Sequence, residues 1–132
     1  MARMISFTKG HGTGNDFVLI HDADNSLDLK ASQVAKLCDR HFGIGADGFI
    51  RVIESRFLPE GAELLKDNPE AKWFMDYRNA DGSKAEMCGN GVRVFARYLI
   101  DKGLVSITNG ETLTVGTRAG VRDVQPNRAG FA

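Results

Sequence analysis

The segment Cys88-Gly-Asn-Gly-Val-Arg-Val-Phe-Ala-Arg-Tyr-Leu-Ile-Asp-Lys-Gly103 decides the fold, because it contains the strongest helical pattern in the chain. Over residues 92–102 the apolar residues recur at helical spacing, and the stripe consists of Val92, Phe95, Ala96, Leu99 and Ile100. Val94 and Tyr98 lie off this stripe, so the helix is apolar around much of its circumference. Such a helix is usually enclosed, and we expect strands to surround it.

Short runs with β character lie on both sides of this helix. They cover residues 5–9, 17–21, 49–53, 73–78, 113–117 and 121–124, and the glycine-rich stretch 10–16 reads as a loop between the first two. A second helix is predicted over residues 31–41, with Ser32 or a neighbour as its cap and Gly43 at its end. Residues 54–72 are polar and hold two of the three prolines, which indicates a surface excursion, and the last residues look irregular.

Strands outnumber helices in this pattern, and no regular alternation of strand and helix is evident. We therefore expect an α+β fold, with a curved, mostly antiparallel sheet wrapped around the central helix. The 132 residues suffice for one domain, and the apolar fraction of 42% is that of a globular protein.

The composition excludes several classes of partner. Seventeen basic residues balance seventeen acidic ones, so we expect no nucleic-acid partner. No segment approaches the ~20 apolar residues that span a bilayer, and the start does not resemble a secretory signal. Cys38 and Cys88 have no metal-ligand spacing and form no disulfide framework, so we expect no metal and a cytoplasmic protein with reduced thiols.

Three motifs that suggest other functions are incomplete. Gly43-Ile-Gly-Ala-Asp-Gly48 fits G-x-G-x-x-G, but a helix is expected before it and a strand after it, the reverse of a dinucleotide site. The alternating acidic residues from Asp22 to Asp28 lack the Gly and Glu of a calcium loop, which favours a solvated acidic loop. For His11, in the glycine-rich stretch, structural hydrogen bonding is the favoured role.

The residues from Asn79 to Gly91 combine features of a reaction centre. Cys88 directly precedes the predicted central helix, where unpaired N–H groups and the helix dipole favour a thiolate. Gly89, Asn90 and Gly91 carry little bulk, so their N–H groups can surround an anion such as a carboxylate. Asn79 and Asn90 add amides that both donate and accept hydrogen bonds. An amino-acid backbone suits such a site.

The two cysteines have competing interpretations. A lone cysteine is often a small buried apolar residue, so Cys88 is either a reactive thiol or a packing residue. Cys38 falls on the apolar face of the predicted helix over residues 31–41, so we expect it to pack.

Four blocks of the sequence, in order, resemble the diaminopimelate epimerase family. They are His11-Gly-Thr-Gly-Asn-Asp-Phe17, Asp39-Arg-His-Phe-Gly-Ile-Gly-Ala-Asp-Gly48, Tyr77-Arg-Asn-Ala-Asp-Gly82 and Met87-Cys-Gly-Asn-Gly-Val-Arg-Val-Phe-Ala96. The resemblance implies a pyridoxal-independent isomerase without a cofactor, which interconverts LL- and meso-diaminopimelate for lysine and peptidoglycan synthesis. It implies two thiols that act on opposite faces of the substrate.

The same resemblance assigns roles to individual residues. It makes Cys88 one of the two acid/base thiols and makes Asn15, Asn79, Gly89 and Asn90 substrate-binding residues. Some members carry Gln at the position of Gly48, so no substrate contact transfers to Gly48.

The resemblance also implies a domain organisation. Members of the family have two similar halves, and residues 1–132 match the first, without the second catalytic cysteine. We therefore expect this chain alone to be inactive and its exposed face to bind the second half or another copy. The alternatives are a related isomerase of the proline racemase or phenazine-biosynthesis type, a non-catalytic half-domain that binds an amino acid or a partner, and a redox-sensitive role for Cys88.

Overall fold

The computed structural model describes residues 5–12, 14–85, 89–108, 110–127 and 130–131. Six strands form one sheet in the order β1-β2-β3-β4-β5-β6. Their bounds are Thr8–Gly12, Asn15–His21, Gly48–Glu54, Trp73–Asn79, Leu113–Thr117 and Gly120–Val124. Three α-helices accompany the sheet, namely α1 over Ala31–Cys38, α2 over Pro59–Asp67 and α3 over Gly89–Asp101. The short 3-10 helix η1 covers Ser55–Phe57, and β7 (Pro126–Asn127) pairs with β8 (Gly130–Phe131).

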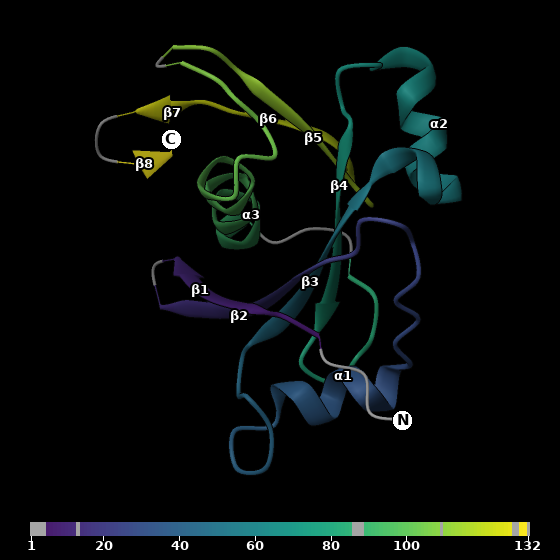
Figure 1. The fold of residues 1–132 in the computed structure, drawn as a ribbon, viewed down its shortest axis with the longest axis vertical. Coiled ribbons are helices and arrows are strands. Elements are labelled where there is room, and N and C mark those ends of the chain that lie inside the picture. Colours follow the sequence, from purple (N-terminus) through teal and green to yellow (C-terminus); the bar gives the residue numbers. More distant parts are fainter. Residues whose placement is uncertain (1–4, 13, 86–88, 109, 128–129, 132) are drawn as a thin grey trace.

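The sheet bends around α3, as the sequence predicts (Figure 1). Helix α3 packs against β1 at one edge and against β6 at the other. Six of its residues are buried, namely Gly91, Val92, Val94, Phe95, Ala96 and Leu99. Val94 is among them although it lies off the apolar stripe, because strands approach the helix from more than one side. The prediction of an enclosed central helix is therefore confirmed.

The sheet is mixed, because two of its five strand pairs are parallel. β2 pairs in parallel with β3, and β4 in parallel with β5, while the other three pairs are antiparallel. Each parallel pair is connected through a helix, α1 in the first case and α3 in the second. This alternation is not evident in the sequence, since the parallel partners are separated by long connections with little pattern of their own. The α+β class is nevertheless confirmed.

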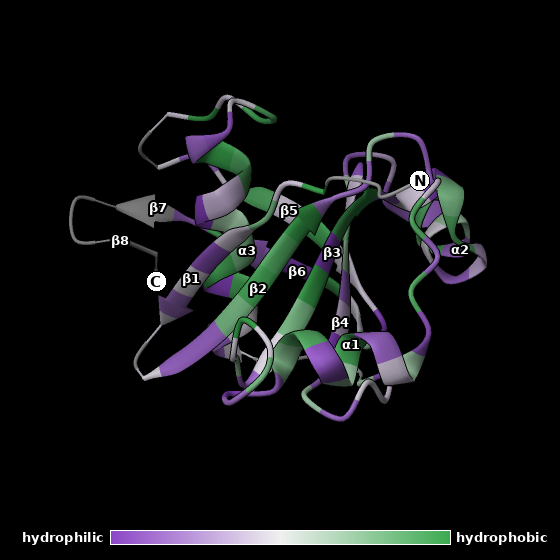
Figure 2. Cartoon of the chain, turned by 60° about the horizontal axis from the view of Figure 1, so that its bottom comes forward, coloured by the Kyte–Doolittle hydropathy of each residue, from purple (hydrophilic) through white to green (hydrophobic). Residues whose placement is uncertain are grey.

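Two apolar clusters lie on the two faces of the sheet. Phe17, Leu19, Ile50 and Met75 belong to the cluster that includes α3. The other cluster joins α1 to the opposite face, and its members are Val18, Ile20, Leu27, Val34, Cys38, Ala46 and Phe49. Figure 2 shows β2 as hydrophobic along its middle and hydrophilic at its start. Because successive residues of a strand point to opposite faces, β2 contributes to both clusters.

Several local predictions are wrong. The stretch 10–16 is mostly strand, since β1 runs to Gly12 and β2 begins at Asn15. Residues 54–72 lie mostly at the surface, as predicted, but they contain an unpredicted helix, α2. It begins with Pro59 at its first turn, a position where proline needs no N–H partner. Ser32 lies inside α1, and the Gln33 side chain accepts a hydrogen bond from the Lys30 N–H at its start.

Both helix ends near the glycine clusters also differ from expectation. Helix α1 ends at Cys38 rather than at residue 41. Gly43 nonetheless folds back on it, since a Cβ there would meet the Lys36 carbonyl oxygen at 1.9 Å. Helix α3 begins at Gly89, three residues before the predicted start, because glycine obscures the helical pattern. The final residues form the β7–β8 pair rather than an irregular tail.

Candidate functional site

Three neighbouring strands bring Asn15 and Asn79 to one end of the sheet. Asn15 is the first residue of β2, Gly48 the first of β3 and Asn79 the last of β4. In the register Phe17 lies opposite Gly48, and Gly48 lies opposite Asn79. Asn15 and Asn79 have the same strand parity as residues that pack against α3, so both belong to the face that α3 covers.

The N-terminus of α3 meets this end of the sheet through Asn90. The Asn90 side-chain nitrogen donates to the Asn15 side-chain oxygen at 3.2 Å, across 75 residues of sequence. Gly12 permits the close approach, because a Cβ there would lie 3.2 Å from Val94 and 3.5 Å from the Asn90 carbonyl oxygen. The sequence blocks around Asn15 and Asn90 are therefore parts of one surface.

Gly89 lies at the open side of this surface. Among the residues that the structure describes outside this helix, none would lie within 4 Å of a Cβ on Gly89, so the first turn of α3 is open toward them. The N–H groups of a first helical turn have no partner within the helix and carry partial positive charge. The arrangement can therefore accept an anionic group beside two asparagine amides.

Asn79 is held by its own turn rather than by Asn15 or Asn90. Its side-chain nitrogen donates to the Ser83 hydroxyl at 3.1 Å, and its carbonyl oxygen accepts from the Gly82 N–H at 2.8 Å. Residues 79–82 thereby form a turn, with Gly82 at a φ of +86°. Within the described part of the chain, the Asn79 side-chain oxygen has no hydrogen-bond donor, which leaves it available to a ligand.

Cys88 lies outside the described residues, and in the sequence it directly precedes Gly89 at the start of α3. Cys38 is buried in α1, and burial raises the pKa of its thiol above the ordinary value. The prediction that Cys38 packs is confirmed.

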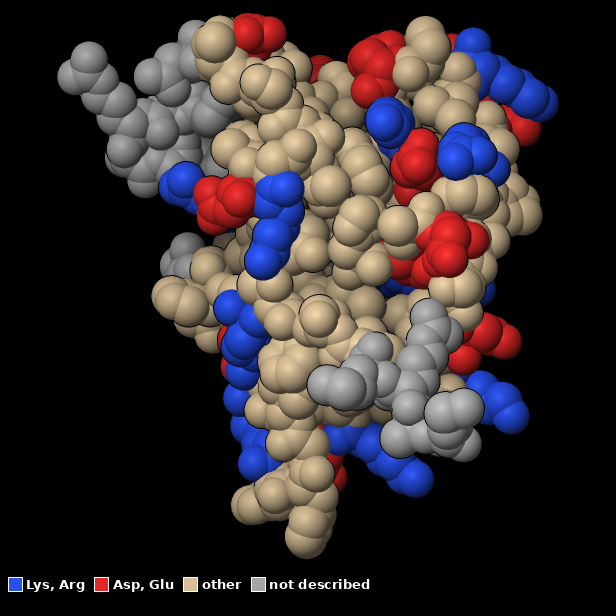
Figure 3. Space-filling view, viewed as in Figure 1, with Lys and Arg blue, Asp and Glu red and all other residues tan. Residues whose placement is uncertain are grey.

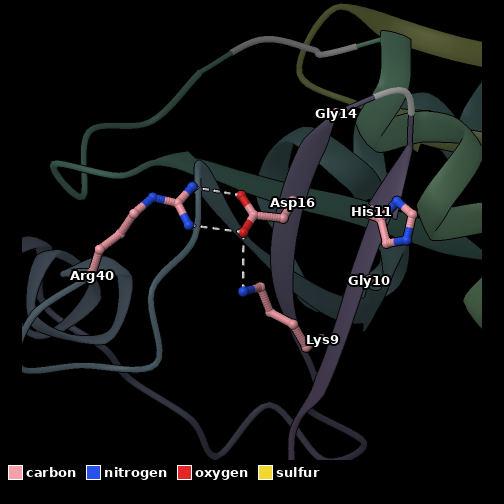
Figure 4. Close-up of a pocket in the computed structure, with 6 residues that line it drawn as sticks. All are labelled: Lys9, Gly10, His11, Gly14, Asp16 and Arg40. Carbon is pink, nitrogen blue, oxygen red and sulfur yellow. Dashed lines mark hydrogen bonds and ion pairs between the residues drawn. The ribbon is translucent and has the colours of Figure 1, made fainter.

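A cluster of charges behind Asn15 was not found from the sequence. Asp16 accepts two hydrogen bonds from the Arg40 guanidinium, at 2.8 and 3.0 Å, and forms an ion pair with Lys9 at 3.0 Å (Figure 4). Arg40 also contacts Asp47, and the backbone N–H groups of Asp16 and Asp47 each donate to the other's carboxylate. The Arg40 hydrogen bonds in particular hold the pKa of Asp16 well below its usual range.

This charge cluster borders a surface pocket of about 410 Å³, which Lys9, Gly10, His11, Gly14, Asp16 and Arg40 line. Asp16 alternates with Asn15 along β2, so the cluster belongs to the face opposite α3. These ion pairs and hydrogen bonds hold the start of β2 against the turn that leads into β3. Asp16, Arg40 and Asp47 lie within the quoted sequence blocks, and Lys9 lies just before the first of them. The pairing of these charges depends on tertiary structure and has no signal in their spacing.

The glycine motif of residues 43–48 and the acidic loop after β2 have structural roles. Residues 43–48 connect α1 to β3, in the order that the sequence predicts. A Cβ on Gly48 would lie 2.6 Å from the Tyr77 ring and 3.0 Å from the Arg78 carbonyl oxygen, so a larger residue there would require Tyr77 to move. Asp22 is buried rather than solvated, because the N–H groups of Ser26 and Leu27 and the Arg51 guanidinium bind its carboxylate. His11 is exposed on β1.

The surface shows charges of both signs. In the view of Figure 3 an uncharged region runs down the middle of the molecule, with acidic and basic side chains around it.

In the described ranges of the chain, no three His, Cys, Asp or Glu side chains gather as metal ligands would. A search of the same residues finds no helix that could cross a membrane.

The fold of this chain is found in a solved structure. The chain superimposes on the Bacillus anthracis phenazine biosynthesis protein of the PhzF family with a TM-score of 0.59. The match covers 96% of this chain and 36% of that protein, at 20% sequence identity, and it shows a shared fold.

The sequence comparison is more specific, and the chain belongs to the diaminopimelate epimerase family, whose model matches residues 7–131. It is 55% identical to the diaminopimelate epimerase of Streptomyces coelicolor over 124 residues and 59% identical to that of Thermobifida fusca over 121 residues. These matches cover 94% and 89% of this chain. The chain spans 41% and 42% of the length of these two relatives.

Proposed function

We propose that this chain supplies one side of the active site of a diaminopimelate epimerase, which interconverts LL- and meso-diaminopimelate. The observation that carries this proposal is the Asn90–Asn15 hydrogen bond, which joins two of the four family blocks at the N-terminus of α3. Membership of the family supports the substrate, since the relatives from Streptomyces coelicolor and Thermobifida fusca are both named for this activity.

Each site residue has a role that fits its chemistry. The N–H groups at Gly89 and Asn90 would bind the α-carboxylate of the substrate, where negative charge develops as the α-proton leaves. Asn15 would donate a hydrogen bond to the same end of the substrate. The free oxygen of Asn79 would accept one from an ammonium group.

Cys88 would exchange the proton at the α-carbon. Its thiolate sulfur takes the α-proton, so the Cα–H bond breaks and its electron pair remains on the substrate, delocalised toward the carboxylate. A thiol on the opposite face then gives its proton to the α-carbon and becomes a thiolate. The configuration is thereby inverted, the two sulfurs have exchanged protonation states, and the reaction needs no pyridoxal. A helix N-terminus directly after Cys88 favours the thiolate.

The second thiol would come from the second half of a two-half enzyme, of which residues 1–132 are the N-terminal half. This chain alone would therefore bind diaminopimelate weakly and epimerise it negligibly. A cytoplasmic location fits the reaction, because a reducing compartment keeps both thiols free.

The test uses a two-half enzyme assembled from this chain and the second half of a family member. In D₂O it should convert LL-diaminopimelate to the meso form and introduce one deuterium at the inverted carbon. An aziridine analogue of diaminopimelate should label Cys88 covalently. Cys88→Ala should abolish turnover, whereas Cys38→Ala should leave the chemistry intact in the fraction that folds. Turnover by the Cys88→Ala enzyme, or by this chain alone, would refute the proposal.

A further inference from the structure

The asparagine pair at the start of α3 continues through a third side chain, Arg93. The Arg93 guanidinium donates a hydrogen bond to the Asn90 side-chain oxygen, while the Asn90 side-chain nitrogen donates to Asn15. Arg93 is exposed, one helical turn beyond Asn90, and no part of the proposed mechanism uses it.

The chemistry of these groups fixes which amide atom of Asn90 faces Arg93 and which amide atom of Asn15 faces Asn90. Arginine carries only donors, so the Asn90 atom that meets it has to be the amide oxygen. The Asn90 nitrogen then faces Asn15, and the Asn15 atom that meets it has to be its oxygen. The Asn15 nitrogen remains, and no residue in the described part of the chain accepts a hydrogen bond from it.

We propose that Arg93 is a positioning residue, which orients the amides of Asn90 and Asn15 so that Asn15 presents N–H donors to the substrate carboxylate. This inference rests on the proposed function for the identity of the carboxylate. If the Asn15 amide were rotated by 180°, its oxygen would face the substrate carboxylate and repel it. The donor-only character of arginine is what prevents that reversal.

Substitutions of Arg93 should therefore change the KM for diaminopimelate by different amounts. Arg93→Lys keeps a donor and should rescue the wild-type orientation. Arg93→Met removes the donor, so both amide orientations become accessible and the KM for diaminopimelate should rise about twofold, since half of the molecules are then competent. Arg93→Glu supplies an acceptor, which reverses both amides, and the KM should rise about tenfold or more, with a smaller change in kcat. Arg97→Glu is the matched control, because it makes the same change of charge one turn further along α3 and should leave the KM within about twofold.

Two measurements separate this inference from the proposed function. The first is the side-chain amide ¹⁵N–¹H spectrum of the chain, in which Arg93→Glu should shift the Asn15 and Asn90 NH₂ signals and Arg93→Lys should not. The second is the KM in the two-half enzyme. Equal Asn15 signals in the Lys and Glu variants would overturn the orienting role of Arg93. Shifted signals with an unchanged KM would overturn the contact between Asn15 and the substrate. If the wild-type two-half enzyme had no epimerase activity, the proposed function would be refuted. The amide spectrum would still decide the role of Arg93.

Discussion

Arg51 and Asp76 lie directly opposite each other on β3 and β4, and the Arg51 Nε donates to the Asp76 carboxylate at 2.8 Å. Asp76 is only 1% exposed, and Arg118 binds its other oxygen. Arg51 also donates to Asp22, which is buried on the segment after β2. The Asp76 carboxylate therefore joins the centre of the sheet to the β5–β6 hairpin.

Asp76→Asn should destabilise the protein strongly. The substitution keeps the shape of the side chain but removes the charge that balances two largely buried arginines, a loss that typically costs about 3–5 kcal/mol. Urea unfolding followed by circular dichroism measures the effect. The exposed Asp28 is the matched control, and Asp28→Asn should change the free energy of unfolding by less than about 0.5 kcal/mol. Similar values for the two variants would contradict the role of Asp76.

The stability of the protein should fall in acid, and Asp16 should contribute to the fall. Hydrogen bonds from Arg40 lower the pKa of Asp16 in the folded state, so the folded form binds that proton less tightly than the unfolded form. The stabilisation is therefore complete above the unfolded value of about 3.9 and decreases as the pH falls below it. Asp16→Asn should flatten the curve of unfolding free energy between about pH 5 and pH 2. A curve with unchanged slope would show that Asp16 is not paired in solution.

The two cysteines should differ in reactivity in the folded protein. Burial raises the pKa of Cys38, so iodoacetamide should modify it only when the chain unfolds. Cys88 should react in the native state, with a rate that increases with pH through a pKa below the free value of about 8.5. Peptide mass spectrometry after timed labelling distinguishes the two sites. Rapid native labelling of Cys38 would contradict its place in the packed interface of α1.

Gly82→Ala and Gly89→Ala should have opposite effects: the first should lower the stability of the fold, and the second should weaken ligand binding. Gly82→Ala should cost about 2 kcal/mol or more, because Gly82 has a φ of +86° and a Cβ there would meet the Ala31 carbonyl oxygen at 2.1 Å. Gly89→Ala should leave the thermal midpoint nearly unchanged, since a Cβ at that position meets none of the described residues outside its own helix. The methyl group would nonetheless project where the ligand is proposed to bind, so Gly89→Ala should weaken the binding of diaminopimelate. A destabilised Gly89→Ala protein would contradict the open space at the start of α3.

Local patterns in the sequence predicted the parts of the fold that depend on periodicity. Most of α3 and the strands over residues 17–21 and 113–117 follow from the spacing of their apolar residues. Helix α2 was missed because its sequence is polar and short, and its main contacts come from η1 and β5. The parallel pairing of β2 with β3 depends on how α1 crosses the sheet, and that crossing has no local signature.

The candidate site was predictable only in part. The sequence places Gly89 and Asn90 at a helix start with Asn79 nearby, and the family resemblance adds Asn15. The contact between Asn90 and Asn15 could not be predicted, because it depends on glycines in β1 that let α3 approach. The sequence predicts a solvated Asp22 and assigns no role to Asp16, because the arginines that bind these two carboxylates lie far away in the sequence.

The 75-residue separation of Asn15 and Asn90 has a consequence for the order of folding. The two amides meet only when α3 has docked onto β1 and β2, so we expect this corner to form late in folding. By the same reasoning it is among the first to open when the domain is heated or exposed to denaturant. Ligand affinity should therefore decline at denaturant concentrations that leave the helical signal in circular dichroism unchanged.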